Sequence, residues 1–305
     1  MATLSAAAGQ TGWRAAVPWW TRIAAKLILS RLPLGGKAWQ SLGLFSPGFM
    51  LEPDYAITVF RHHFERAGRP AAGFRFLELG PGDSLASAIV AWAHGADGGW
   101  LVDAGAYAAR DLAAYQPLFR SLSARRATLN LPRDAAELSD CDNVAAMLTR
   151  TGCHYREDGL AGLRAIPNDS IDFAFSQAVL EHVPRAEFVA SMIELCRALA
   201  PGAAASHQID FKDHLGGGLN NLRFADSLWE RPWFARRSGF YTNRLRLSEI
   251  VAAMTQAGFA VDIAEQRHWP VAPLPRARLA PQFRPLNDDD LRTSSALVIG
   301  RKHGR

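Results

Sequence analysis

The chain is poor in cysteine, and it lacks long hydrophobic runs. Its three cysteines are widely spaced and form no Cys-x-x-Cys pair, which argues against a structural zinc site or a disulfide framework. The apolar stretches are short and interrupted by Arg, Lys, Gly or Pro, so we expect no transmembrane helix. With 305 residues the chain can bury a full core, and we expect a cytoplasmic protein with reduced thiols.

Acidic residues are missing from the first 51 positions, and the whole net charge of +5 lies there. The basic residues of this leader are Arg14, Arg22, Lys26, Arg31 and Lys37. From Glu52 onward, 29 basic residues balance 29 acidic ones, and this neutral body argues against a nucleic-acid partner. We expect a helix over Trp19–Leu32 and interpret the leader as a lid over a cofactor pocket. A peripheral membrane or partner-binding helix and a targeting segment are the alternatives.

Beyond about residue 70, apolar runs alternate with longer helical stretches, which is typical of an α/β sheet with crossover helices. We expect strands at Phe74–Leu79, Trp100–Asp103, His154–Glu157, Ile171–Phe175, Ala204–Ile209, Phe259–Ala264 and Ala296–Gly300. We expect helices at Ser84–Ala93, Ala106–Leu122, Asn143–Thr149, Arg185–Leu199 and Leu247–Ala257, the last ending at Gly258.

A further helix is expected to begin at Asp54, as its capping residue, and to run to Gly68. We therefore divide the chain into a helical extension over residues 1–70 and a sheet domain over residues 71–305. Two connections, at about 104–152 and 210–246, are longer than a crossover needs. Long insertions of this kind usually carry substrate contacts.

The first predicted strand leads into the loop Gly80-Pro81-Gly82-Asp83-Ser84, whose glycines let the backbone turn sharply and approach a ligand. The third glycine of the dinucleotide fingerprint is missing, because Leu85 stands three positions after Gly82. Glu78 and Asp83 flank the turn and would repel a pyrophosphate. They would attract a ligand that carries an ammonium and a sulfonium, as S-adenosylmethionine does.

Two further carboxylates follow the next predicted strands. Asp103 ends the second strand, where it could accept bonds from both ribose hydroxyls of a cofactor, although a solvated strand-end Asp is the alternative. Asp158 follows the third strand and could accept the adenine amino group. A polar turn residue explains Asp158 equally well.

The sequence Glu-Leu-Gly-Pro-Gly at 78–82, Asp103 and the run Ser-Ile-Asp-Phe-Ala-Phe-Ser-Gln-Ala-Val-Leu-Glu-His-Val at 170–183 resemble the class I S-adenosylmethionine-dependent methyltransferases. The resemblance spans roughly Phe74 to Lys302 and implies a Rossmann-like sheet of seven strands in order 3-2-1-4-5-7-6. Helices would cover both faces, and the last strand would be antiparallel. The segments Leu42–Gly48 and Glu52–Tyr55 extend the resemblance to stand-alone bacterial members with a helical N-terminal region.

This resemblance implies S-adenosylmethionine as the cofactor. It assigns cofactor contacts to Glu78, Gly80, Pro81, Gly82, Asp83, Ser84, Asp103, Asp158 and Gln177. Gln177 would line the pocket near the reacting sulfur. Ser84 stands where many members have a third glycine, and it can cap the following helix instead. His182 we interpret as a helix-start residue that holds its loop, with a catalytic role as the alternative.

Acid–base residues follow the fifth predicted strand, where a methyl acceptor should lie. Our catalytic candidates are His207, Asp210, Asp213 and His214. For transfer to a hydroxyl, either histidine could remove the proton, oriented by either aspartate. A divalent cation ranks lower, because alternation along the strand separates some of these side chains, so we expect no metal. A polar loop without chemistry is the remaining alternative.

The insertion after this strand interleaves arginines with aromatic residues. Our candidate substrate contacts there are Arg236, Arg237, Tyr241 and Arg244. Guanidinium groups bind phosphate or carboxylate, and aromatic rings stack on bases or sugars. We expect an anionic or glycosylated small molecule, such as a nucleotide-linked sugar. The alternative is a surface lid whose arginines pair with acids elsewhere.

The sequence therefore predicts a methyltransferase that uses S-adenosylmethionine, acts on a small molecule and methylates an oxygen. A nicotinamide-dependent oxidoreductase is the first rival, disfavoured by Leu85 and the carboxylates around the glycine loop. A non-catalytic module that keeps this fold for protein interaction is the second. The acceptor, the choice between an oxygen, a nitrogen and a carbon as the methylated atom, and the oligomeric state stay open.

Overall fold

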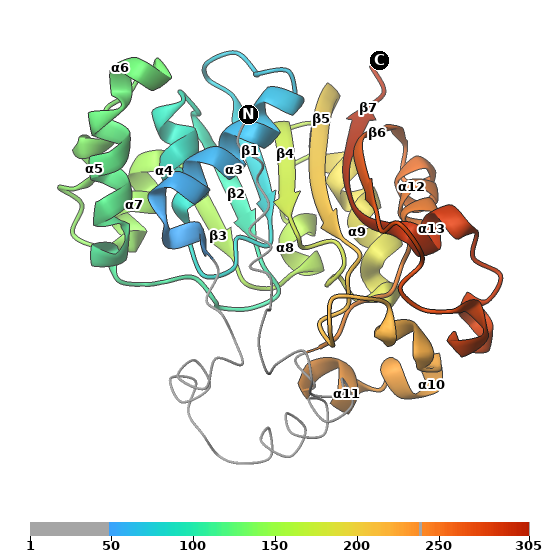
Figure 1. The fold of residues 1–305 in the computed structure, drawn as a ribbon. Helices are drawn as coiled ribbons and strands as arrows, with labels where there is room; N and C mark the ends of the chain where they lie inside the picture. The colour runs from blue at the N-terminus through green and yellow to red at the C-terminus, as the bar shows by residue number, and fades with distance from the viewer. Residues whose placement is uncertain (1–48, 238–239, 305) are drawn as a thin grey trace.

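The computed structural model describes residues 49–237 and 240–304 (Figure 1). For Phe49, Arg236 and Arg237 it describes the backbone only. The helix expected over Trp19–Leu32 and the leader up to residue 48 lie outside the described residues. The described part forms one seven-stranded sheet with helices packed on both sides.

The sheet has the strand order 3-2-1-4-5-7-6, which confirms the expected topology. The strands from β1 to β5 pair in parallel, and β7 runs antiparallel to both β5 and β6. The strands are β1 (Arg75–Leu79), β2 (Gly98–Val102), β3 (Cys153–Arg156), β4 (Ile171–Gln177), β5 (Leu199–Asp210), β6 (Phe259–His268) and β7 (Thr293–Lys302). All seven overlap the runs predicted from sequence, because each run is apolar and β-rich enough to be recognised.

Eleven α-helices and six short 3-10 helices are described. The α-helices are α3 (Pro53–Arg66), α4 (Ala86–Ala93), α5 (Gln116–Ala124), α6 (Arg126–Leu129), α7 (Val144–Thr151), α8 (Leu160–Arg164), α9 (Arg185–Ala198), α10 (Asp226–Trp229), α11 (Pro232–Arg237), α12 (Leu247–Gln256) and α13 (Asp288–Arg292). The 3-10 helices are η2 (Phe49–Leu51), η3 (Leu112–Tyr115), η4 (Ala135–Leu138), η5 (Asn220–Arg223), η6 (Arg276–Arg278) and η7 (Pro281–Phe283).

Two apolar cores lie on the two faces of the sheet. The first joins α3, α4, α5 and α7 to the sheet through side chains such as Phe60, Phe76 and Phe175. The second joins α8, α9 and α12 to the other face through Leu77, Ala205 and similar residues. Because successive side chains of a strand point to opposite faces, each buried strand supplies both cores. The helix α3, which lies within residues 1–70, thus packs on the sheet through the first of these cores.

Several helix ends differ from the expectation by a few residues. The helix α3 begins at Pro53 and Glu52 is its cap position, so Asp54 lies in the first turn rather than capping it. A proline is well suited to that first position, because its missing N–H would have no partner there. Residues 104–111 are not helical, and the segment predicted over Ala106–Leu122 becomes helical only at Leu112. Gly258 ends α12 in the left-handed region with φ +101°.

The long connections fold into small structured units. The segment after β5 forms η5, α10 and α11 around Leu215, Trp229, Phe234 and Phe240. A second unit between β6 and β7, which the sequence did not predict, forms η6, η7 and α13 around Leu274 and Phe283. In the described part of the chain, no helix is long and apolar enough to span a membrane.

Candidate active site

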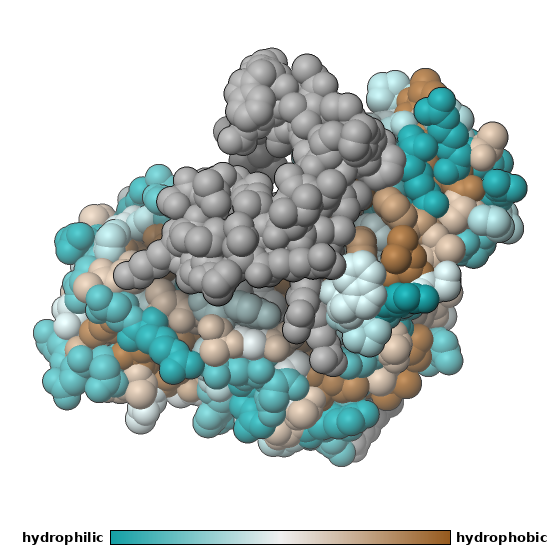
Figure 2. Space-filling model, turned by 90° about the horizontal axis from the view of Figure 1, so that it is seen from below, coloured by the Kyte–Doolittle hydropathy of each residue, from teal (hydrophilic) through white to brown (hydrophobic). Residues whose placement is uncertain are grey.

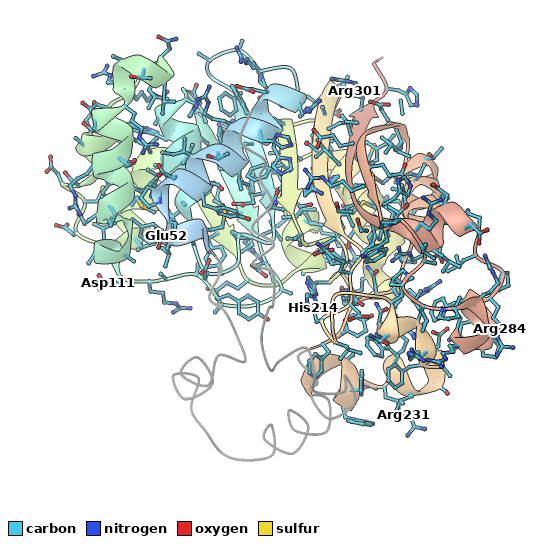
Figure 3. All side chains as sticks on the ribbon, viewed as in Figure 1. Glu52, Asp111, His214, Arg231, Arg284 and Arg301 are labelled. Atoms are coloured by element: carbon cyan, nitrogen blue, oxygen red, sulfur yellow. The ribbon has the colours of Figure 1, made fainter. Side chains whose placement is uncertain are left out.

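The carboxyl ends of the parallel strands meet at the lower edge of the molecule in Figure 1, and most of the predicted site residues lie there. Figure 3 marks this edge with His214, which follows β5, while Arg301 near the end of the antiparallel β7 lies at the opposite edge. In a sheet of this type, ligands bind beyond the carboxyl ends of the strands. Figure 2 views the molecule from this side.

The turn after β1 contains two glycines in the left-handed backbone region, where glycine is favoured. Gly80 has φ +68°, and a Cβ atom at this position would lie 2.5 Å from both γ-methyl carbons of Val179. Gly82 has φ +66°, and a Cβ atom there would meet no described residue within 4 Å. Gly80 is therefore required for packing between β1 and the segment after β4. Around Gly82, no atom of the described residues restricts a side chain.

The carboxyl group of Glu78 lies just before this turn and is buried, with 2% of the residue exposed. Burial raises the pKa of Glu78 to about 8; the adjacent hydroxyl of Ser87 lowers it, and the nearby charge of Asp103 adds a smaller increase. Within the described residues, the Oε2 atom of Glu78 has no hydrogen-bond partner. An unpartnered buried oxygen of this kind is costly unless a ligand supplies a donor or a positive charge.

Asp103 follows β2 and contacts the same turn. Its Oδ2 atom accepts a hydrogen bond from the backbone N–H of Gly82 at 2.8 Å, and its Oδ1 atom accepts one from Ala104 at 2.7 Å. Burial raises the pKa of Asp103, while these two backbone bonds lower it. The hydroxyl of Ser84 accepts a bond from the N–H of Ala86 at 3.1 Å, but Leu85 occupies the cap position of α4, so Ser84 precedes the cap instead of forming it. The turn, Asp103 and the start of α4 thus form one connected unit.

Asp158 has a partner of its own. Both of its carboxylate oxygens accept hydrogen bonds from the guanidinium of Arg156, at 3.1 Å and 2.5 Å. This bond lowers the pKa of Asp158. To bind an adenine amino group, the Asp158 carboxylate would have to accept a bond from it in addition to those from Arg156, or give up its bonds with Arg156.

Gln177 ends β4 at the carboxyl edge and belongs to a chain of hydrogen bonds that the sequence did not reveal. Its side-chain oxygen lies 3.0 Å from Nε2 of His63, and its side chain also interacts with the hydroxyl of Tyr55. His63 in turn lies 2.8 Å from the hydroxyl of Ser206 on β5. Both Tyr55 and His63 come from α3, whose alternating polar and apolar pattern shows only that one face is buried.

The four catalytic candidates lie at the end of β5 and in the loop after it, and they differ in burial. His207 is fully buried, and its Nδ1 atom lies 2.7 Å from the hydroxyl of Ser176. Burial lowers the pKa of His207 to about 3. Asp213 is buried and accepts backbone hydrogen bonds from Leu215, Gly217 and Asn220, so it holds the loop that follows.

His214 and Asp210 are more accessible. The ring of His214 is exposed and stacks on the ring of His182, with centroids 5.1 Å apart and planes at 15°. The two rings bring the segments after β4 and β5 into contact at the carboxyl edge. Asp210 is half-buried, and its carboxylate accepts a bond from the N–H of Lys212 at 2.9 Å.

The described arginines of the insertion form internal contacts. Arg244 is 2% exposed, donates to the carbonyl of Phe224 and pairs with Asp226 and Glu230. Tyr241 donates to Glu230 at 2.9 Å. Arg246, 1% exposed, donates to three backbone carbonyls, those of Phe211, Asp290 and Thr293. The side chains of Arg236 and Arg237 lie outside the described part.

One more buried carboxyl group lies near this edge, and the sequence did not single it out as a site. Glu181, in the segment after β4, is 6% exposed, and burial raises its pKa to about 8. Its Oε2 atom also has no hydrogen-bond partner among the described residues. Over residues 49–237 and 240–304, no group of three or more His, Cys, Asp or Glu side chains is arranged to hold a metal ion.

Comparison with known proteins gives matches among solved structures alone. No protein-family model and no curated protein matches the chain. The YcgJ protein of Bacillus subtilis has 14% identity and a TM-score of 0.43, covering 81% of this chain and 99% of its own. An S-adenosylmethionine-dependent methyltransferase of Mesorhizobium loti has 17% identity and a TM-score of 0.40, covering 80% and 96%.

A third match is phosphoethanolamine N-methyltransferase 2 of Haemonchus contortus, solved with phosphomonomethylethanolamine and S-adenosylhomocysteine. It has 13% identity and a TM-score of 0.45, and the match covers 81% of this chain and 53% of that protein. This chain therefore spans about half the length of the Haemonchus enzyme. The fold assignment itself rests on the strand order observed here.

Proposed function

We propose that the protein is an S-adenosylmethionine-dependent methyltransferase that acts on a small-molecule acceptor. The observation that carries this proposal is the buried, unpartnered carboxylate oxygen of Glu78 beside the turn at Gly80 and Gly82. A cationic ligand seated in this turn would satisfy the oxygen, whereas a pyrophosphate would be repelled. The same charge argument disfavours a nicotinamide dinucleotide.

The residues at the edge fit the other parts of the cofactor. Asp103 uses one bond on each carboxylate oxygen, which leaves acceptor sites for ribose hydroxyls. No described residue lies within 4 Å of the Cβ position of Gly82, so the described part of the chain leaves room for a ligand to approach the backbone closely. When bound, S-adenosylmethionine supplies an electrophilic methyl group on a sulfonium. Gln177, at the end of β4, lines the pocket near the sulfur in this proposal, and Asp158 remains the adenine candidate.

The acceptor would lie beside His214, at the end of β5. His214 is the catalytic candidate whose ring is exposed at the carboxyl edge, and we assign it the role of base for a hydroxyl acceptor. Asp210 is the accessible carboxylate on the same strand end. His207 and Asp213 support the strand and the loop through the contacts described above. An anionic or glycosylated acceptor would be bound by Arg236 and Arg237 of α11, which lies at this edge in Figure 1.

Calorimetry with S-adenosylhomocysteine tests the cofactor assignment. Free Glu78, with a pKa of about 8, is protonated below that pH, and binding of an ammonium group favours its carboxylate. Binding should therefore release a proton, and affinity should rise by up to about tenfold per pH unit between pH 6 and 8. Glu78→Gln should bind more weakly at pH 8 and lose most of this rise.

Glu181→Gln is the matched control, because Glu181 is also buried with a pKa of about 8 but lies outside the glycine turn. This variant should keep the pH dependence of the unmodified protein. No binding of S-adenosylhomocysteine at millimolar concentration would reject the proposed function. Binding of NADH instead would favour an oxidoreductase.

A further inference from the structure

A chain of four side chains crosses from β5 through α3 to the carboxyl edge. The hydroxyl of Ser206 lies 2.8 Å from Nδ1 of His63, and Nε2 of His63 lies 3.0 Å from the side-chain oxygen of Gln177. The side chain of Gln177 also interacts with the hydroxyl of Tyr55, whose pKa burial raises and this interaction lowers. Ser206 and His63 are completely buried, whereas Gln177 and Tyr55 are half-buried near the edge.

Donors and acceptors can be assigned along this chain from its inner end. Within the described residues, the hydroxyl of Ser206 has one hydrogen-bond partner, Nδ1 of His63. If Ser206 accepted from His63, its own proton would be buried without an acceptor, at a cost of about 1–3 kcal/mol. Ser206 therefore donates to Nδ1, and the ring proton of a neutral His63 lies on Nε2.

The rest of the chain follows from this tautomer. Nε2–H of His63 donates to the amide oxygen of Gln177, which turns the NH₂ group of Gln177 toward Tyr55 and the edge. The ring of His63 stacks on the ring of Phe175, with centroids 5.2 Å apart and planes at 29°, and this contact restricts rotation of the His63 ring. Burial lowers the pKa of His63 to about 3, so the ring stays neutral at physiological pH.

We propose that His63 is a positioning residue of the cofactor site, which fixes the Gln177 amide with its oxygen inward and its NH₂ group at the carboxyl edge. Without this contact the amide could rotate by half a turn and present an acceptor instead of a donor. Ser206 acts one step further away, because it selects the tautomer of His63. The inference rests on the proposed function for the nature of the ligand, but the orientation of the chain belongs to the free protein.

Nitrogen NMR of protein labelled at its nine histidines tests the orientation without a ligand. The expected result is a neutral ring with its proton on Nε2 for the resonance that disappears in His63→Phe, from pH 5 to 8. In Ser206→Ala, both tautomers should become populated. A proton on Nδ1 in the unmodified protein would reverse the chain and overturn the proposal.

Binding of S-adenosylhomocysteine tests the positioning role through a double-mutant cycle. His63→Phe keeps an aromatic ring against Phe175 but removes both hydrogen bonds, and affinity should fall about 3- to 10-fold. In a Gln177→Ala background, the same substitution should change affinity less than twofold, because the amide to be positioned is gone. A loss of equal size in both backgrounds would show a general structural effect and overturn the proposal, as would an unchanged affinity.

His94→Phe is the matched control. His94 packs on Phe60, with ring centroids 5.3 Å apart, but its ring bonds with the carbonyl of Val90 and not with Gln177. This variant should bind S-adenosylhomocysteine like the unmodified protein. If His63→Phe fails to fold, Ser206→Ala takes its place. In this variant both tautomers of His63 should be populated, and the affinity for S-adenosylhomocysteine should fall about twofold. Failure of the unmodified protein to bind would reject the proposed function, while the tautomer would still decide the orientation.

Discussion

Two regions at the carboxyl edge are rich in charged residues, and they use their charges differently. In the turn after β1, Glu78 is buried with an oxygen that accepts no hydrogen bond from the described residues, and no described residue fills the space beside Gly82. In the insertion after β5, the buried charged side chains form hydrogen bonds and ion pairs with other groups of the protein. Arg246 donates to three backbone carbonyls and Asp213 accepts from three backbone N–H groups, while Arg244 binds a carbonyl and two carboxylates and leaves its Nε atom without a hydrogen-bond partner among the described residues.

The difference shows that a high density of charge in the sequence does not identify a binding site. A buried ion with all of its hydrogen bonds made within the chain stabilises local structure and has little left for a ligand. A buried ion with an unmade bond costs stability in the free protein and is the better candidate for binding. The comparison can be tested by substitutions in each region.

The largest expected effect is on stability, from Arg246→Met. The substitution keeps much of the apolar length of the side chain but leaves the carbonyls of Phe211, Asp290 and Thr293 without their donor. We expect a loss of about 3 kcal/mol or more in the free energy of unfolding, measured by denaturant titration. Affinity for S-adenosylhomocysteine should be unchanged at temperatures where the variant is folded.

Arg231→Met is the control for this substitution. Arg231 is exposed and makes one hydrogen bond from its side chain, to the carbonyl of Ser227 at 2.8 Å. Its loss should change stability by no more than about 0.5 kcal/mol. A loss below about 1 kcal/mol for Arg246→Met would contradict the structural role.

The second effect separates the two glycines of the β1 turn. Both alanine variants should lose about 1–2 kcal/mol from the positive φ angle, but Gly80→Ala should lose more because its Cβ would overlap Val179. Val179→Ala should restore part of that additional loss. In Gly82→Ala the methyl group overlaps no described residue but lies where the ligand would approach the backbone. Its loss in the free energy of binding S-adenosylhomocysteine should therefore exceed its loss in the free energy of unfolding. Equal effects of the two variants on affinity would refute the distinction.

The smallest expected effect on folding comes from α11. Replacing both Arg236 and Arg237 by Ala should leave thermal stability and S-adenosylhomocysteine affinity unchanged, in contrast to Arg246→Met. If these arginines bind the acceptor, KM for an anionic acceptor should rise about 3- to 10-fold. Unchanged KM and kcat would remove the anionic acceptor from the proposal and leave the cofactor assignment intact.

Much of the framework could be predicted from the sequence. The seven strands were recognised by their apolar runs, and the position of Gly258 was recognised as a left-handed helix end. The unit between β6 and β7 was missed, because its short 3-10 helices have no periodic pattern to detect. The cap of α3 lies two positions before the expected one, at Glu52 instead of Asp54, since both a proline and an aspartate stand where a helix commonly begins.

The site was predicted less completely. Glu78, Gly80 and Gly82 could be named because a glycine turn after a strand has a local signature. The chain from Ser206 through His63 to Gln177 joins residues 143 and 114 positions apart, and no local pattern indicates such contacts. The acid–base cluster expected over His207–His214 is divided by the pleat and by the loop, which bury some of its members and expose others.

The sequence by itself determined which residues form strands, where the chain turns with positive φ, and how the charge is divided between leader and body. These properties depend on local periodicity, on backbone sterics and on composition. Only the tertiary structure decided which charged groups have partners. Whether Arg244 pairs with Asp226, or whether Glu78 is left with an unmade bond, depends on burial and on the position of distant backbone groups. Those are set by the packing of the whole chain.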